Sequence, residues 1–244
     1  MRDFRRCLLL VLCCSSSLAW ADPRPDLYVE DPYAPHNTSG SLASLGTMVG
    51  FLYGLPQSIS ELGIVASAGE RWGRFSLQVE GAYYDLEAES TYMTGLGPTS
   101  GNVGIGRGER IAVLGRLEVL RFDSRWIGPN SLAAVYVEGG AASEWVQFTS
   151  PLDNGFRPDN THRIEGVVGA GLMLDHRLQE PIGFPHRIAW FLGLRLAVSP
   201  HEAMTTTVCR TESTCAREEM PGEPTDSGPV DQSMIFQSSL AFTF

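Results

Sequence analysis

The chain has 244 residues, with 18 basic and 28 acidic side chains, and its formal net charge is −10 at pH 7. All of the basic residues are Arg. An acidic chain without a basic cluster argues against nucleic-acid binding, because Lys and Arg are the residues that neutralise phosphates. The length suits a single domain, and no run of about 18 apolar residues predicts a transmembrane helix.

The first residues have the pattern of a secretory signal peptide. Arg2, Arg5 and Arg6 precede a short apolar run, Cys7–Cys14, and an A-x-A site ends at Ala21. This pattern is typical of export signals, and the apolar run is too short to span a bilayer. We expect residues 1–21 to be removed, which takes away three Arg and one Asp and leaves 15 basic and 27 acidic residues, a net charge of about −12.

The segment that follows, residues 22–41, contains four Pro among acidic and polar side chains. A stretch of this composition buries too little apolar surface to fold by itself. We therefore expect a flexible periplasmic segment before the folded domain.

The rest of the chain alternates apolar and polar residues in segments that are separated by Gly, Pro and Asn. Successive side chains of a β-strand point to opposite faces, so this alternation predicts strands that each have one apolar face. Eight strands are predicted, at residues 42–54, 59–69, 74–84, 111–119, 133–141, 164–174, 188–198 and 231–244. An even number of such strands indicates an all-β fold, an antiparallel up-and-down transmembrane β-barrel over residues 42–244.

The connections between these strands differ in length in an alternating way. The connections expected outside the cell are residues 55–58, 86–108, 150–161 and 200–230, and those expected in the periplasm are 70–73, 122–131 and 177–186. Three of the four outward connections are the longest in the chain, as is typical of outer-membrane barrels. The first outward connection is an exception.

Aromatic residues are expected in two belts, at the two surfaces of the membrane. Those placed toward the periplasmic end are Trp72, Phe75, Phe122, Trp126, Trp190, Phe242 and Phe244. Those placed toward the opposite end are Phe51, Tyr53, Tyr83, Trp145 and Phe236. For any single aromatic residue, ordinary packing explains its position equally well, so the prediction depends on their joint placement.

The last strand has an apolar face that ends the chain. Phe244, Phe242 and Leu240 alternate with Thr243 and Ala241. This ending resembles the C-terminal signal strand of bacterial outer-membrane β-barrels, whose last residue is typically Phe. The whole pattern resembles small barrels of the OmpA type, here without a periplasmic domain. The resemblance implies a Gram-negative outer membrane as the location, the barrel assembly machinery as a partner, and Phe242 and Phe244 as its assembly signal.

Charged residues of both signs fall on the face that would point into the barrel. They are Glu80, Arg116, Glu118, Glu138, Arg163, Glu165, Arg187 and Arg195. The interior of an eight-stranded barrel is barely wide enough for its own side chains, so these charges must pair. We expect a salt-bridged plug with Arg116 at its centre, between Glu80 and Glu138; a narrow gated conduit is the alternative.

Two cysteines remain after the signal peptide, Cys209 and Cys215. An even pair, close in sequence in an exported chain, predicts a disulfide across a loop. Two lone thiols do not supply the ligands of a zinc site, so we expect no metal and no cofactor.

The sequence favours a non-enzymatic barrel with a structural or surface-interaction role, in contact with outer-membrane lipid and lipopolysaccharide. A lipid A-modifying enzyme is one alternative, for which only His162 and His201 reach the outer side. A narrow porin-like channel and a secreted soluble β-sandwich are the others. No nucleophile elbow of the G-x-S-x-G type occurs, and no catalytic residue or extracellular ligand is predicted.

Overall fold

The computed structural model describes residues 39–53, 59–94, 97–123, 131–150, 158–178, 185, 187–200, 205–211, 214–219 and 230–244. The predicted signal peptide, most of the predicted flexible segment, Trp126 and His201 lie outside the described residues. Among those described, no helix is long and apolar enough to cross a membrane.

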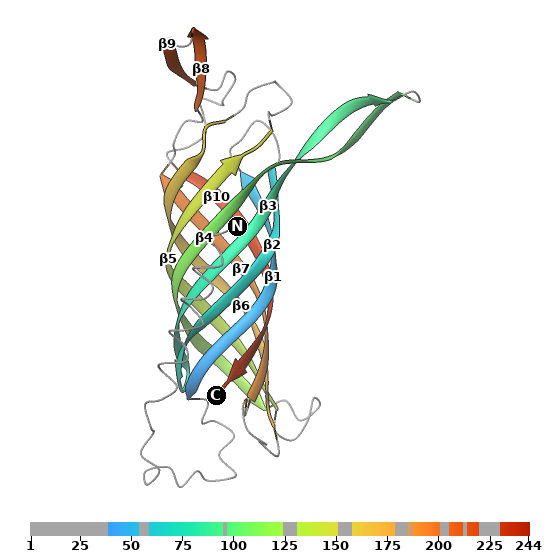
Figure 1. Cartoon of the computed structure of the whole chain (residues 1–244). Coiled ribbons are helices and arrows are strands. Elements are labelled where there is room, and N and C mark those ends of the chain that lie inside the picture. The colour runs from blue at the N-terminus through green and yellow to red at the C-terminus, as the bar shows by residue number, and fades with distance from the viewer. Residues whose placement is uncertain are drawn as a thin grey trace.

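Eight strands form a closed antiparallel barrel, which confirms the predicted fold (Figure 1). These strands are β1 (Gly40–Tyr53), β2 (Ile59–Trp72), β3 (Phe75–Thr94), β4 (Gly97–Asp123), β5 (Ser131–Phe148), β6 (Thr161–Arg177), β7 (Arg187–Pro200) and β10 (Val230–Thr243). The strand order around the barrel is β1-β10-β7-β6-β5-β4-β3-β2. The first and last strands close it, with Cα partners from Leu42 and Thr243 to Tyr53 and Gln232.

Side chains alternate between the interior and the outer wall along each strand. In β10, Thr243, Ala241 and Ser239 are buried, whereas Phe236 and Leu240 are exposed. The predicted assignment of the two faces is therefore correct for this strand, and the same alternation continues in β7. The outer wall is apolar, and the interior carries most of the buried polar groups.

One predicted loop is wrong. Residues 86–108 were expected to form an outward loop, but β3 continues to Thr94 and β4 already begins at Gly97. The register between the two strands shifts at Leu86/Glu87, which marks a bulge, and beyond it they continue as a two-stranded ribbon that projects from the barrel (Figure 1). The Gly-rich part of β4 has no apolar alternation, so periodicity did not reveal this strand; its backbone pairing with β3 defines it.

A second hairpin lies within the predicted outward connection 200–230. It consists of β8 (Thr205–Thr211) and β9 (Thr214–Glu219), which pair only with each other. Cys209 and Cys215 are register partners in this hairpin. Their side chains are not among those described, so the disulfide stays a prediction.

The two ends of the barrel differ. The C-terminus and the start of β1 lie at one end, which we call the terminal end; the ribbon of β3 and β4 and the β8–β9 hairpin extend beyond the opposite end, which we call the far end (Figure 1). Phe244 N donates to Ser41 O at 2.9 Å and so continues the pairing of β10 with β1 at the terminal end.

Closure between β1 and β10 depends on a small residue at Gly46. A Cβ at this position would overlap the backbone of Ser238 and the side chain of Ser239, whereas a Cβ at Gly81 on the outer wall would meet nothing within 4 Å. We predict that Gly46→Val lowers the free energy of unfolding of the refolded protein by about 1–3 kcal/mol. The matched variant Gly81→Val should change it much less. Circular dichroism during heating measures both, and equal effects would contradict the close approach at the seam.

Candidate functional site

The centre of the barrel holds an ionic cluster that we call the middle cluster. It consists of Glu80 from β3, Arg116 from β4, Glu138 from β5 and Arg195 from β7, with Gln237 from β10. Arg195 binds both Glu80 and Glu138, and Arg116 binds Glu138 at 3.0 Å. All five side chains are buried, so each carboxylate meets opposite charge where water cannot solvate it.

The residue at the centre of this cluster is Arg195, not Arg116 as the sequence suggested. Arg195 reaches across the barrel interior from β7 to Glu80 on β3, and these two strands are not neighbours. Arg116 instead lies between two aromatic rings, with its guanidinium carbon 4.4 Å from the centre of Tyr136 and 4.2 Å from that of Phe191. The order of strands along the sequence predicts which strands are neighbours in the sheet. It does not predict which side chains meet across the interior.

A second cluster, the upper cluster, lies toward the far end. Arg110 Nη2 is 2.8 Å from Glu144 and 3.8 Å from Glu61, and Arg110 Nε is 3.2 Å from Glu165. Arg163 binds Glu144 and lies 3.1 Å from Glu165. The Tyr84 hydroxyl donates to Glu144. This cluster contains three carboxylates and two guanidiniums.

A third cluster, the lower cluster, lies toward the terminal end. Arg71 contacts Glu118 at 2.5 Å and Asp175 at 2.8 Å. Arg187 contacts Asp175 at 3.0 Å, and Arg121 contacts Glu118 at 2.5 Å. Here three guanidiniums meet two carboxylates, the reverse of the upper cluster.

The structure places all eight predicted interior charges in these three clusters. Four lie in the middle cluster, two in the upper cluster and two in the lower cluster. Six partners were missed. They are Glu61, Arg71, Arg110, Arg121, Glu144 and Asp175. Arg110, Glu144 and Asp175 lie one to three residues beyond the predicted strand ends, so continuing the alternation in β4, β5 and β6 would have found them.

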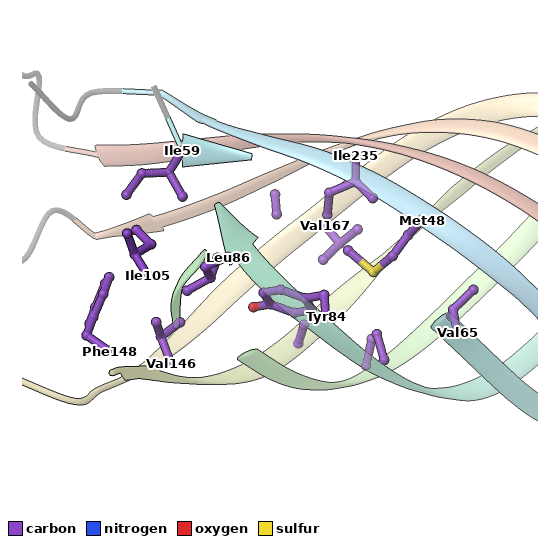
Figure 2. Close-up of a cluster of buried hydrophobic side chains, with 14 of the residues drawn as sticks. Met48, Ile59, Val65, Tyr84, Leu86, Ile105, Val146, Phe148, Val167 and Ile235 are labelled. Carbon is purple, nitrogen blue, oxygen red and sulfur yellow. The ribbon is translucent and has the colours of Figure 1, made fainter. Parts of the chain in front are cut away.

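Above the upper cluster, apolar side chains fill the far end of the interior. Ile59, Leu86, Ile105, Val146 and Phe148 are buried and come from β2, β3, β4 and β5 (Figure 2). We call this group the apolar cap. Its members are buried, whereas the Arg163 side chain of the upper cluster is 16% exposed. Among the described residues, no group of three or more His, Cys, Asp and Glu side chains has the arrangement of a metal site.

On the outer wall near the far end, a serine and a histidine meet. Ser143 Oγ lies 2.8 Å from His162 Nε2, and the imidazole ring stacks on Trp145 with centroids 4.9 Å apart. Trp145 is 40% exposed. Of the two histidines expected near this side, His162 is thus part of a defined contact.

At the terminal end, the outer wall carries exposed aromatic residues. Trp72 and Phe75 stack with centroids 6.0 Å apart, and Phe122 and Trp190 lie on the same wall. Phe122 and Trp190, with Leu172 and Leu192, line a wholly apolar groove of about 280 Å³. Both predicted aromatic belts have exposed members on the outer wall. They are Trp72, Phe75, Phe122, Trp190 and Phe244 of one belt, and Phe51, Trp145 and Phe236 of the other.

Comparison with known proteins finds no matching family model and no matching curated protein. Among solved structures, the fold is similar to the crystal structure of Neisserial surface protein A (NspA), with a TM-score of 0.50 and 12% sequence identity. The match covers 84% of this chain and 98% of that chain. At this identity the similarity shows the fold alone, that of a small closed barrel.

The middle cluster can be tested through Arg195. Arg195→Ala leaves Glu80 and Glu138 buried with less compensating charge, and we predict a loss of about 3–5 kcal/mol of unfolding free energy. Arg107, which binds Gln147 on the outer wall, is the matched control, and Arg107→Ala should cost about 0.5 kcal/mol or less. Denaturant unfolding of both variants measures the difference. An unchanged Arg195→Ala variant would show that water reaches this cluster.

Proposed function

We propose that this chain is a non-enzymatic outer-membrane β-barrel protein with a salt-bridged, closed interior and a surface-interaction role at its far end. One observation carries the proposal: the distribution of polarity is inverted relative to a soluble protein. Fourteen charged side chains meet in the interior clusters, whereas large apolar side chains such as Leu45, Ile164 and Val168 are more than half exposed on the outer wall. Hydrocarbon, not water, is the solvent that suits such a wall.

Backbone hydrogen bonding supports the same location. In hydrocarbon every backbone polar group must be paired within the protein, and a closed barrel achieves this because it has no edge strand. The exposed aromatic residues, Trp72, Phe75 and Phe122 at one end and Trp145 toward the other, suit the two interfaces of a bilayer. In the alternative of a soluble β-sandwich, the charged faces would be exposed to water and the apolar faces buried.

A plugged interior is favoured over a conduit by two features. The three clusters occupy successive levels of the interior, and Arg195 and Arg71 each bridge carboxylates from two different strands. Above them the apolar cap fills part of the interior with buried side chains. An eight-stranded barrel leaves little space beyond what its own side chains fill.

The projecting ribbon is the surface that we assign to interaction. Between Glu89 and Asn102 the strands β3 and β4 pair with each other, beyond the levels at which β3 pairs with β2 and β4 pairs with β5. Strand edges of this kind present unpaired backbone groups, which another extended segment can bind. The β8–β9 hairpin emerges at the same end (Figure 1). The ligand would therefore be bound through the far end, which we assign to the cell exterior.

A test on intact cells addresses location and orientation together. An epitope tag at residues 95–96, between β3 and β4, should be detected by antibody on intact cells, and a tag within 124–130 should be detected only after the outer membrane is opened. The folded protein should be recovered in the outer-membrane fraction and should migrate differently on SDS gels before and after heating. Deletion of Phe244 should lower the amount of this folded form. Recovery as a soluble protein without a heat-dependent shift would refute the location.

Planar-bilayer recordings with the same purified protein separate the plug from a channel. A closed interior predicts no steady conductance above that of the lipid alone. Reproducible single-channel steps from the unmodified protein would instead support the conduit.

A second candidate function, acyl transfer or hydrolysis on outer-leaflet lipid, is favoured by the Ser143–His162 contact. A serine within hydrogen-bond distance of a histidine is the pairing that activates a nucleophile. Two features weigh against it. Among the described residues no carboxylate orients the other nitrogen of His162, and the neighbouring backbone amides belong to the β5–β6 ladder rather than to an oxyanion hole.

Mass spectrometry of outer-membrane lipid separates these candidates. We predict identical lipid spectra after incubation with the wild-type protein and with Ser143→Ala. A shortened or additional acyl chain that appears with the wild type and disappears in Ser143→Ala would establish the enzymatic candidate.

A further inference from the structure

The upper cluster has one more carboxylate than it has guanidiniums. Glu61, Glu144 and Glu165 share Arg110 and Arg163, and none of the three carboxylates is more than 2% exposed. A guanidinium does not lose its proton in proteins. A neutral cluster therefore requires that one of the three carboxylates carries a proton or binds a further cation.

The three carboxylates are held very differently. Glu144 accepts hydrogen bonds from Arg110, Arg163 and Tyr84. Glu165 lies within salt-bridge distance of the same two arginines, 3.2 Å from Arg110 and 3.1 Å from Arg163. Glu61 has one salt-bridge contact among the described residues, to Arg110 at 3.8 Å, and neither of its carboxylate oxygens has a hydrogen-bond partner although the side chain is fully buried.

Four further buried polar atoms of the described residues lack hydrogen-bond partners. They are Ser199 Oγ, Ser233 Oγ, Arg110 Nε and Glu165 Oε2. Ser199 follows Val198, the register partner of Gly166, so it lies beside Glu165 where β6 and β7 continue. On β1 the neighbour of Glu61 is Gly50, where a Cβ would overlap the carboxylate. The carboxylate of Glu61 thus lies between Gly50 of β1 and Arg110 of β4, in space that a side chain at Gly50 would fill.

We propose that Glu61 is a proton-binding site, whose carboxyl group holds a proton in the folded barrel at neutral pH. Burying a neutral carboxylic acid costs far less free energy than burying an ion whose only partner is distant. The groups that face it are Tyr84 from β3, Arg110 from β4, Glu144 from β5, and Arg163 and Glu165 from β6. With Glu61 neutral, two carboxylates balance two guanidiniums.

A metal ion suits the site less well than a proton. Hard cations take several oxygen ligands, including backbone carbonyls. The carbonyls of β1, β2 and β10 around Glu61 belong to the barrel ladder. A proton needs no coordination shell, and the Glu61 side chain is fully buried.

The proposal sets the sign of a pH effect. Glu61 ionises readily in the unfolded chain but not in the folded barrel, so its contribution favours folding in acid and is lost as the pH rises. The loss ends once Glu61 also ionises in the folded state. Glu61→Gln, which resembles the protonated form, lacks this dependence.

The experiment compares unfolding of the refolded wild type and of Glu61→Gln in detergent between acid and neutral pH. We expect the ratio of their unfolding equilibrium constants to change by up to tenfold per pH unit, with the variant increasingly the more stable. Parallel pH profiles, or a variant much less stable than the wild type at neutral pH, would overturn the proposal. Glu144→Gln is the matched control and should be strongly destabilised, because it removes an ionised partner of both arginines.

Infrared spectroscopy gives a second readout, which is taken first on the folded wild type. The wild type at neutral pH should show the carbonyl stretch of a buried protonated carboxylic acid, and Glu61→Gln should lack it. Absence of this band from the folded wild type would overturn the proposal. A second outcome would also overturn it: a wild type whose stability depends on sodium or potassium rather than on pH, while that of Glu61→Gln does not. The site would then hold a cation instead of a proton.

Discussion

The structure depends on one constraint: an eight-stranded barrel encloses a space that its own side chains must fill, so any charge inside must meet opposite charge there. The chain satisfies this constraint with arginines that each contact more than one carboxylate. Arg195 joins Glu80 and Glu138, and Arg71 joins Glu118 and Asp175. Because these contacts link strands that are distant in sequence, they connect the two sides of the barrel in addition to the backbone ladder.

The balance of charge changes along the barrel axis. The upper cluster has one carboxylate in excess, the middle cluster is balanced, and the lower cluster has one guanidinium in excess. Within these three clusters seven carboxylates meet seven guanidiniums, although neither the upper nor the lower cluster is balanced by itself. The two unbalanced clusters differ in how their charged groups are bonded, because neither carboxylate oxygen of Glu61 has a hydrogen-bond partner, whereas Arg121 of the lower cluster also donates to the backbone of Gly73 in the β2–β3 turn. The excess charge is thus most costly at Glu61.

The sequence was sufficient to predict the number of barrel strands, their faces and the presence of interior charges, because all three follow from a two-residue period that acts within each strand. It was insufficient where contacts cross the interior or where the period is absent. Arg195 could not be told from Arg116 as the central residue, since both face inward at mid-height. The ribbon formed by β3 and β4 was missed because its Gly-rich sequence shows no alternation, and Glu61 lay in a predicted strand without any sign of its isolation.

The interior charges also determine which register the strands adopt. A slip of one residue in a strand moves its inward set to the outer wall. For β7 this would place Arg187 and Arg195 on the apolar wall and turn Trp190, Leu192 and Leu194 inward. In an apolar strand such a slip would exchange similar residues at little cost. In β7 the slip would break the contacts of Arg195 with Glu80 and Glu138 and would place its guanidinium on the apolar outer wall. Buried ion pairs that contribute little net stability therefore still favour the native register strongly over registers that are shifted by one residue.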